Sequence, residues 1–202
     1  MTTKQKILEE SLALFAEKGY TAVYVADIAK AVGIKAPSLY KHYRSKQEIF
    51  DSCIKVFYER MRVMTGNFSI LNKSITDVTE EMFFDITQSI FLFYLHDEIA
   101  SKLRKMLSIE RYGNEKLNAI YVELFLDEPI RFETGLFDEL IHAGILKQND
   151  PAILAYRYYT LLFFLLIKYD MHPADDREAL QELKKVTKDF FDSYKEVPAN
   201  VT

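Results

Sequence analysis

Apolar residues recur with helical spacing along almost the whole chain. In the first two segments they form one-sided stripes, made of Leu8, Leu12 and Phe15 and then of Val25, Ile28, Ala29 and Val32. Gly19 and Gly33 follow these stripes, at positions where glycine commonly ends a helix. Glycine and proline are scarce, with 6 and 5 residues, which argues against a turn-rich β-sandwich. The pattern predicts an all-α protein.

The same spacing predicts further helices after residue 45. They are expected over about 46–64, 75–95, 98–112, 115–126, 130–143, 151–169 and 176–194. Ser45 and Glu48 have the spacing of a capping box, and Asp150-Pro151 reads as an N-cap before an N1 proline. Pro129 either kinks or separates the two helices around it. We expect a small domain over 1–46, a larger one over 47–202, and a linking helix over about 46–64.

Residues 21–46 show the order of a helix-turn-helix: a short helix, the Gly33 turn, a second short helix over about 36–42, and a capped third helix. Leu39 and Tyr43, at i and i+4, form the inner face of the second short helix. The residues left facing outward are Lys35, Ala36, Ser38, Tyr40, Lys41 and His42. Such side chains bind DNA phosphates and base edges, so this segment is a candidate DNA-binding head.

Charge is distributed unevenly along the chain. The net charge of the 202 residues is −4, yet residues 1–62 hold 11 Lys and Arg against 7 Asp and Glu. A basic head on an acidic body is expected when only the head approaches phosphate, although chance variation between two solvated faces would look similar. Cys53, the single cysteine, excludes an internal disulfide and a cysteine-rich zinc site, and reads as a small buried apolar side chain.

The head resembles the DNA-binding domain of TetR/AcrR-type bacterial transcriptional regulators. The residues that carry the resemblance are Gly19-Tyr20, Val25, Asp27-Ile28-Ala29, Gly33, Leu39-Tyr40, His42-Tyr43 and Ser45-Lys46. They cover about the first fifty residues, and the remaining 150 resemble the family only in length and helical character. The resemblance implies a homodimeric regulator, chiefly a repressor, that binds a palindromic double-stranded DNA operator and responds to a small molecule.

By position, the resemblance implies phosphate contacts from Tyr40, His42 and Lys46. It implies base or phosphate contacts from Lys35, Ala36, Ser38 and Lys41. The chain departs from the family pattern at Val23-Tyr24, where a Thr/Ser cap is usual, and Tyr24 is the candidate contact there. It also has Lys35 where a serine often precedes the recognition helix, which removes a cap but adds a cation.

The segment 151–169 is apolar on all sides, so it must be covered on all sides. One face can pack inside the subunit, and the other needs a partner, which favours a four-helix interface between two chains. TetR-like proteins dimerise through their last two long helices. The predicted dimer interface consists of Leu154, Tyr158, Leu161, Leu162, Leu165, Leu183 and Phe190.

The helices between head and dimer segment enclose a small-molecule pocket in members of the family. The candidate lining residues are Phe83, Phe84, Phe91, Met106, Tyr112, Tyr121 and Phe125. Each of them taken alone is better explained as a core residue. An apolar or aromatic effector is expected; Glu110 or Glu123 could pair with a cationic one, but neither is preferred.

The sequence also bears on two other classes of function. An enzyme is disfavoured because the four histidines lack metal-ligand spacing and the sequence contains no Gly-rich phosphate loop, GxSxG or HExxH motif. We therefore expect no metal and no cofactor. A protein-interaction module on the same fold remains an alternative. The chain opens without a signal peptide, and its longest apolar run, near 158–167, is half of a membrane span, so a cytoplasmic protein that does not enter a membrane is expected.

Overall fold

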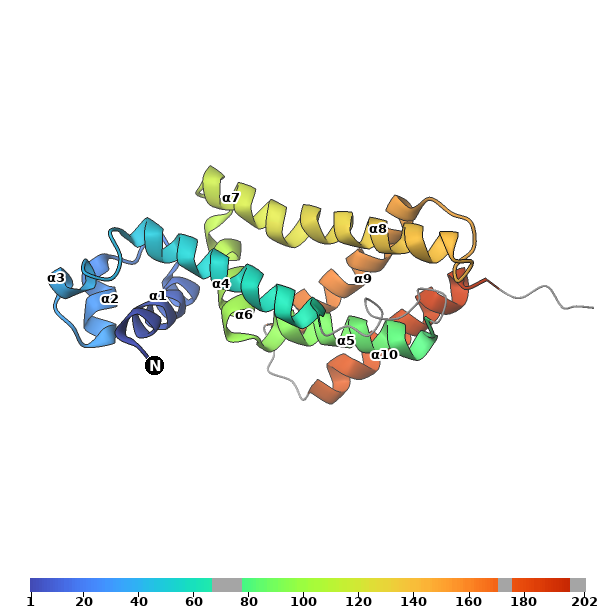
Figure 1. Cartoon of the computed structure of the whole chain (residues 1–202), viewed down its shortest axis with the longest axis horizontal. Helices are drawn as coiled ribbons and strands as arrows, with labels where there is room; N and C mark the ends of the chain where they lie inside the picture. Colours follow the sequence, from blue (N-terminus) through green and yellow to red (C-terminus); the bar gives the residue numbers. More distant parts are fainter. Residues whose placement is uncertain (67–77, 171–175, 197–202) are drawn as a thin grey trace, which may run out of the picture. The chain divides into compact units, whose positions relative to one another are not determined.

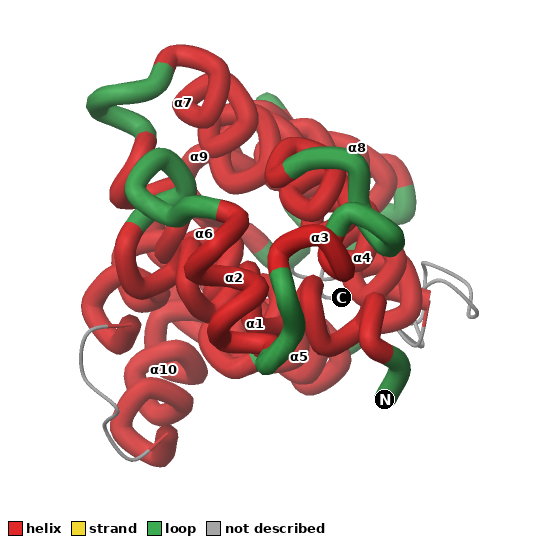
Figure 2. Tube along the Cα trace, turned by 90° about the vertical axis from the view of Figure 1, so that its left-hand side faces the viewer, coloured by secondary structure: helices red, strands yellow, loops and turns green. Residues whose placement is uncertain are grey.

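The computed structural model describes residues 1–66, 78–170 and 176–196, and within these ranges every extended regular element is a helix (Figures 1 and 2). The helices are α1 (Thr3–Lys18), α2 (Val25–Val32), α3 (Ala36–Leu39), α4 (Lys46–Gly66), α5 (Glu80–His96), α6 (Glu98–Glu110), α7 (Glu115–Val122), the π-helical segment Glu123–Asp127, α8 (Glu128–His142), α9 (Pro151–Asp170) and α10 (Asp176–Tyr194). The all-α prediction is confirmed. The predicted start of a helix at residue 75 lies outside the described residues.

The chain divides into two compact units. Unit 1 comprises Met1–Val63 and His96–Phe125, and unit 2 comprises Met64–Leu95 and Leu126–Thr202. This division differs from the predicted domains 1–46 and 47–202, because α6 packs against α1 and so belongs with the head. The long separation in sequence between α1 and α6 hides this packing from a reading of local patterns.

The head forms the elements that its apolar stripes predict. Ile7, Leu12, Phe15 and Ile28 are fully buried, and α1 packs against α2 and α6. The second short helix is shorter than predicted: α3 ends at Leu39, and the backbone of residues 40–42 tightens into i→i+3 hydrogen bonds. The Ser45 half of the predicted capping box is confirmed, because the Glu48 N–H donates to the Ser45 hydroxyl oxygen over 3.1 Å. The Glu48 carboxylate reaches back one residue further than predicted and accepts the Arg44 N–H.

Two glycines end the first two helices, in different conformations. Gly33 has φ +80° and ψ +29°, an ordinary left-handed cap, and an added Cβ would meet nothing within 4 Å. Gly19 has φ +83° and ψ +153°, and an added Cβ would lie 2.6 Å from Oε1 of Glu110. Only glycine adopts the backbone conformation of Gly19 readily, so this position requires glycine for both its backbone and its surroundings.

Pro129 lies in the first turn of α8, where its missing N–H removes no hydrogen bond from the helix interior. The helical backbone continues through the region, with a π-helical turn over Glu123–Asp127 directly before α8. Proline lacks an N–H and its ring crowds the carbonyl four residues earlier, here that of Phe125. A wider turn at that carbonyl relieves the conflict. The division between the two units also falls within this turn.

Unit 2 has an aromatic core. Rings of Phe83, Phe137, Tyr158 and Phe190 contact one another with centroids 5.1–6.4 Å apart. The Tyr158 hydroxyl hydrogen-bonds to that of Thr87 inside this core. Glu133 is 7% exposed, and burial raises the pKa of its carboxyl group well above the ordinary value, which favours the neutral form.

Helix α9 has one buried and one exposed face. The buried face contains Leu154, Tyr158, Leu162 and Leu165, while the exposed apolar residues are Ile153, Tyr156, Leu161, Phe164 and Ile167. Of the predicted dimer-interface residues only Leu161 is exposed; Leu183 and Phe190 of α10 are also buried. The predicted interface is therefore wrong in its choice of face. The apolar spacing of α9 predicts two stripes, and the stripe that was predicted to contact a second subunit is buried in the core of unit 2.

Helix α9 is also more apolar over its full length than the ten-residue run indicates. By length and composition alone it could cross a membrane. Core helices of water-soluble proteins have the same properties, and seven residues of α9 are buried inside unit 2. The exposed apolar residues of α9 form a stripe on the surface of unit 2, which core packing does not account for. This exposed stripe of α9 consists of Ile153, Tyr156, Leu161, Phe164 and Ile167.

Candidate nucleic-acid interface

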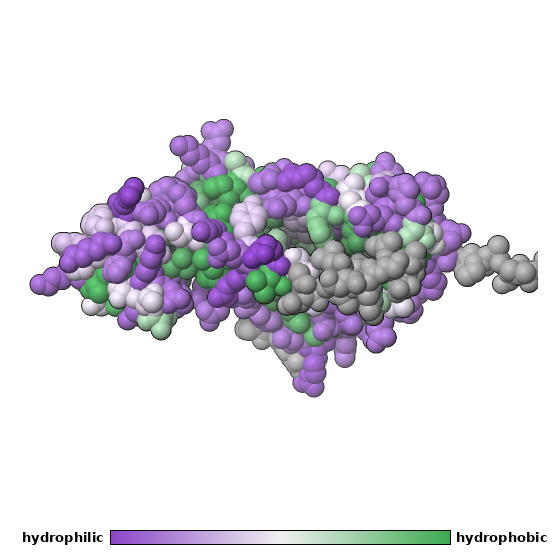
Figure 3. Space-filling view, viewed as in Figure 1, coloured by the Kyte–Doolittle hydropathy of each residue, from purple (hydrophilic) through white to green (hydrophobic). Residues whose placement is uncertain are grey.

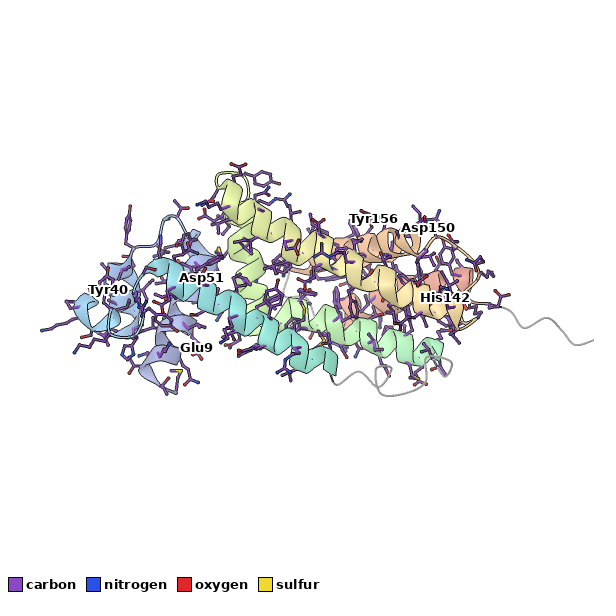
Figure 4. All side chains as sticks on the ribbon, turned by 45° about the horizontal axis from the view of Figure 1, so that its top comes forward. Glu9, Tyr40, Asp51, His142, Asp150 and Tyr156 are labelled. Atoms are coloured by element: carbon purple, nitrogen blue, oxygen red, sulfur yellow. The ribbon has the colours of Figure 1, made fainter. Side chains whose placement is uncertain are left out.

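The recognition face is the outward side of α3 and the turn that follows it. Lys35, Tyr40 and Lys41 are exposed, and the exposed fraction of Tyr40 is 53%. Figure 4 labels Tyr40 on this part of the head. Ala36, Ser38 and His42 are half-buried at its edge. Leu39 and Tyr43 are 0% and 2% exposed, so the structure places them on the inner face, as predicted. Figure 3 shows hydrophilic residues over most of the visible surface of the head.

The start of α2 is capped without the usual Thr or Ser. Oδ2 of Asp27 accepts the Tyr24 N–H over 2.9 Å, so the carboxylate reaches back to the helix start. The Tyr24 side chain is 71% exposed. The departure at Val23-Tyr24 thus leaves the helix start satisfied and frees an aromatic hydroxyl for a phosphate, which keeps Tyr24 among the candidate contacts.

Lys46 occupies a different role from the predicted phosphate contact. Its Nζ donates to the carbonyl oxygens of Tyr20 and Val23 over 2.8 and 2.7 Å, and lies 4.3 Å from the centroid of the Tyr20 ring. Partial burial lowers the pKa of the Lys46 ammonium, an effect that the nearby carboxylate of Glu110 partly offsets. With two of its three donors bound to backbone, Lys46 holds the 19–23 turn against the start of α4.

Glu110 supports the same 19–23 turn from α6. Its Oε1 accepts the Thr21 N–H over 2.7 Å and its Oε2 accepts the Thr21 hydroxyl over 2.6 Å. Glu110 is only 9% exposed. The sequence offered it as a partner for an effector, but the structure commits both of its oxygens to the head. No local signal could have found this contact, because 89 residues separate the partners.

An exposed cation beside the start of α4 was missed by the sequence analysis. Arg44 is exposed, and its N–H donates to Oε2 of Glu48. The N-terminal end of α4 carries a partial positive charge that attracts phosphate. Arg44, next to this end, provides the full positive charge there that Lys46 was expected to provide.

The predicted pocket residues do not form one group. Phe83, Phe84 and Phe91 belong to unit 2, whereas Met106, Tyr112, Tyr121 and Phe125 belong to unit 1. Tyr112 is 87% exposed and does not line the groove that lies between α4 and the α7–π segment of unit 1, so it does not fit the role of an enclosed pocket residue. Phe84 is half-buried, and the other five are buried core residues.

Among residues 1–66, 78–170 and 176–196, no group of three or more His, Cys, Asp or Glu side chains could hold a metal ion. Cys53 is fully buried, and burial raises the pKa of its thiol to about 12. The interpretation of Cys53 as a core residue is confirmed.

Comparisons with known proteins agree with the geometry of the head. The family model described as "Bacterial regulatory proteins, tetR family" matches residues 7–53. IcaR of Staphylococcus aureus, the negative transcriptional regulator of the biofilm operon icaADBC, is 34% identical over 147 residues, which cover 68% of this chain and 77% of that protein.

Solved structures share the fold of the whole chain. A TetR-family regulator from Mesorhizobium loti superimposes with a TM-score of 0.73 and 16% identity, covering 96% of each chain. A transcriptional regulator from Saccharomonospora viridis, solved in complex with choline, gives a TM-score of 0.70 and 18% identity, covering 96% of this chain and 98% of that one.

Proposed function

This chain belongs to the TetR family of bacterial transcriptional regulators, and we propose that it is a cytoplasmic repressor that binds a palindromic operator as a homodimer and is released by a small molecule. The family is one of transcriptional regulators, not of enzymes. IcaR, a relative of this chain, is a negative regulator, which supports repression. The choline complex of a structural neighbour supports a small-molecule effector.

The recognition face is the observation that carries the DNA-binding part of the proposal. Leu39 and Tyr43 anchor the helix to the core, so Lys35, Tyr40 and Lys41 project from a rigid support. Lysines supply the salt-dependent attraction to phosphate, and a tyrosine hydroxyl fixes the register. The same residues on a mobile segment would attract DNA without selecting a sequence.

The exposed stripe of α9 supports the homodimer (Figure 4 labels Tyr156 on it). Beside the stripe, grooves of about 660 and 490 Å³ lie between α9 and α10; Leu161 lines both of them and Phe164 lines the larger one. Apolar surface next to grooves favours close packing against a second copy. Two heads related by a twofold axis then read two half-sites, which gives a palindromic operator.

The proposal is tested by selecting bound fragments from sheared genomic DNA with the full-length chain. An enriched palindrome, and loss of binding in the double variant Lys35→Ala/Lys41→Ala with an unchanged circular dichroism spectrum, is the expected result. A chain that forms dimers yet enriches no sequence would instead favour the protein-interaction alternative.

Lys41→Ala and Lys46→Ala are expected to affect DNA binding for opposite reasons. Lys41→Ala removes an exposed cation, so the slope of log affinity against log salt falls by about 1 per subunit while stability is unchanged. Lys46→Ala removes the donor to two backbone carbonyls, so the free energy of unfolding falls by about 2 kcal/mol while the salt slope is retained. Binding titrations at several salt concentrations and urea denaturation measure the two effects. The reverse pattern would return Lys46 to the role of a phosphate contact.

A further inference from the structure

An open groove lies within unit 1, between α4 and the α7–π segment. It has a volume of about 410 Å³ and is lined by Phe50, Asp51, Ile54, Tyr58, Ala119, Ile120, Glu123 and Leu124. Phe50 and Leu124 form its buried floor, with exposures of 1% and 2%. The floor is apolar, and the polar atoms of the lining side chains belong to Asp51, Tyr58 and Glu123.

The charge of the groove is negative. Asp51 and Glu123, both exposed, stand on its two walls, and no lysine, arginine or histidine is among its lining residues (Asp51 is labelled on α4 in Figure 4). Tyr58, 39% exposed, adds an aromatic ring to the lining. An apolar floor with carboxylates and an aromatic ring is the combination that binds an organic cation, through burial of its apolar body and attraction of its charge.

The wall that carries Glu123 is the π-helical turn described above. Glu123 is the first residue of that turn and Leu124 the second. A π turn inserts one extra residue per turn and so redirects the side chains it carries, and such turns are frequent at functional sites. Here two residues of the turn, Glu123 and Leu124, line the groove. This backbone feature is independent of the charge pattern and falls on the same residues.

A few side-chain contacts connect the groove to the 19–23 turn. Oδ1 of Asp51 accepts from Nε2 of Gln47 over 2.8 Å, and Oε1 of Gln47 accepts from the Tyr20 hydroxyl over 3.2 Å. The rings of Tyr20 and Phe50 also pack, with centroids 5.3 Å apart. Tyr20 is the residue whose ring and carbonyl receive Lys46. A ligand that engages Asp51 and Phe50 therefore touches residues that hold the head.

We propose that this groove binds a small organic cation with an apolar body, and that occupancy changes the affinity of the head for DNA. The cation pairs with Asp51 and Glu123, and its body packs on Phe50, Ile54 and Leu124. Engagement of Asp51 weakens its hydrogen bond to Gln47 and thereby shifts Tyr20 and the 19–23 turn. The binding half of this proposal stands on the groove alone, whereas the regulatory half rests on the proposed function.

Binding is tested with a pair of probes that share their size and apolar surface but differ in charge. Tetraphenylphosphonium and tetraphenylborate are titrated separately into the full-length protein by calorimetry, without DNA. We expect saturable binding of the phosphonium and at least about tenfold weaker binding of the borate, because two carboxylates attract the first and repel the second. Equal affinity for both probes would overturn the proposal.

Variants locate the site. Asp51→Asn and Glu123→Gln should each weaken phosphonium binding by about tenfold, and Ala119→Phe should weaken it by filling the groove. Glu59→Gln is the matched control, since Glu59 is an exposed carboxylate of α4 that pairs with Lys55 and does not line the groove. Phosphonium binding that none of the three groove variants weakens, or that Glu59→Gln weakens as much as they do, would place the site elsewhere.

The regulatory half is measured as the change in operator affinity at saturating phosphonium. A change of at least about fivefold is expected, and bound operator must change phosphonium affinity by the same factor. Gln47→Ala should keep both binding events and reduce this factor. Phosphonium binding with no effect on operator affinity would overturn the regulatory half. If no operator is found at all, the proposed function fails, while the titration without DNA still decides whether the groove binds cations.

Discussion

Phe164→Glu is expected to convert the dimer into monomers and to lower operator affinity at least about 100-fold. Phe164 is 65% exposed and central in the stripe on α9, so in the proposed dimer its ring is covered by the second copy. A glutamate there replaces an apolar contact by a charge that must lose its water shell, which costs several kcal/mol per chain and is doubled by the twofold symmetry. A monomer contacts a single half-site and loses the affinity that the second head provides.

Sedimentation velocity measures the oligomeric state, and a titration with operator DNA measures the affinity. Val63→Glu is the matched control, because Val63 is 60% exposed on α4 and lies outside the α9 stripe. A Phe164→Glu protein that remains dimeric would show that another surface forms the dimer. Wild-type protein that is monomeric in solution but binds to lipid vesicles would assign the stripe to a membrane instead.

The choice of Phe164 follows from the structure and differs from what the sequence suggests. Charged residues at Leu162 and Leu165 look like a test of the dimer when α9 is read as two equivalent stripes. Both side chains are buried in unit 2, at 6% and 4% exposure. A charge at either site would destabilise the subunit itself by about 3 kcal/mol or more, so the resulting loss of dimer would say nothing about the interface.

Gly19→Ala is expected to lower the free energy of unfolding by about 3 kcal/mol or more. At φ +83° and ψ +153° an alanine is strained by its own backbone. Its Cβ would also lie 2.6 Å from Oε1 of Glu110, an oxygen that accepts the Thr21 N–H. Displacing that oxygen leaves the N–H without its partner. The backbone strain and the lost hydrogen bond add, because moving the Glu110 oxygen away from the new Cβ also moves it away from the Thr21 N–H.

Gly33→Ala provides the comparison for Gly19→Ala. Gly33 has a similar positive φ, but nothing lies within 4 Å of an added Cβ, so only the left-handed backbone penalty of about 1–2 kcal/mol applies. Urea denaturation of both variants at one fixed protein concentration gives the two values, since a dimer's stability depends on concentration. Equal losses in the two variants would show that the Glu110 contact contributes nothing at this turn.

The fold of the head was predictable because its signals are local. Val25–Val32 forms a helix with the bounds that its apolar spacing predicts, and Ser45 caps α4 as its spacing with Glu48 predicts. In such segments the same few residues decide the helix, its ends and its buried face. The outward positions of Tyr40 and Lys41 follow directly once Leu39 and Tyr43 are assigned to the core.

The candidate site was less predictable where contacts join distant segments. Lys46 looks like a phosphate ligand by its position in the family pattern, but its ammonium group donates hydrogen bonds to two backbone carbonyls of the 19–23 turn. Glu110 looks available for an effector, but Thr21 binds both of its oxygens. Chemical type alone does not show which of several polar partners a side chain selects, because that choice depends on three-dimensional proximity.

The sequence by itself therefore determined the helices, the basic head and its recognition face, because helix periodicity and capping act over a few residues. Only the tertiary structure decided which stripe of α9 remains exposed, which unit contains α6, and which charged side chains hold the head. Each of these depends on packing between segments far apart in the chain, where several arrangements satisfy the same local pattern. The arrangement that the chain adopts is decided by which segments bury their apolar faces against each other, and the local sequence pattern does not contain that information.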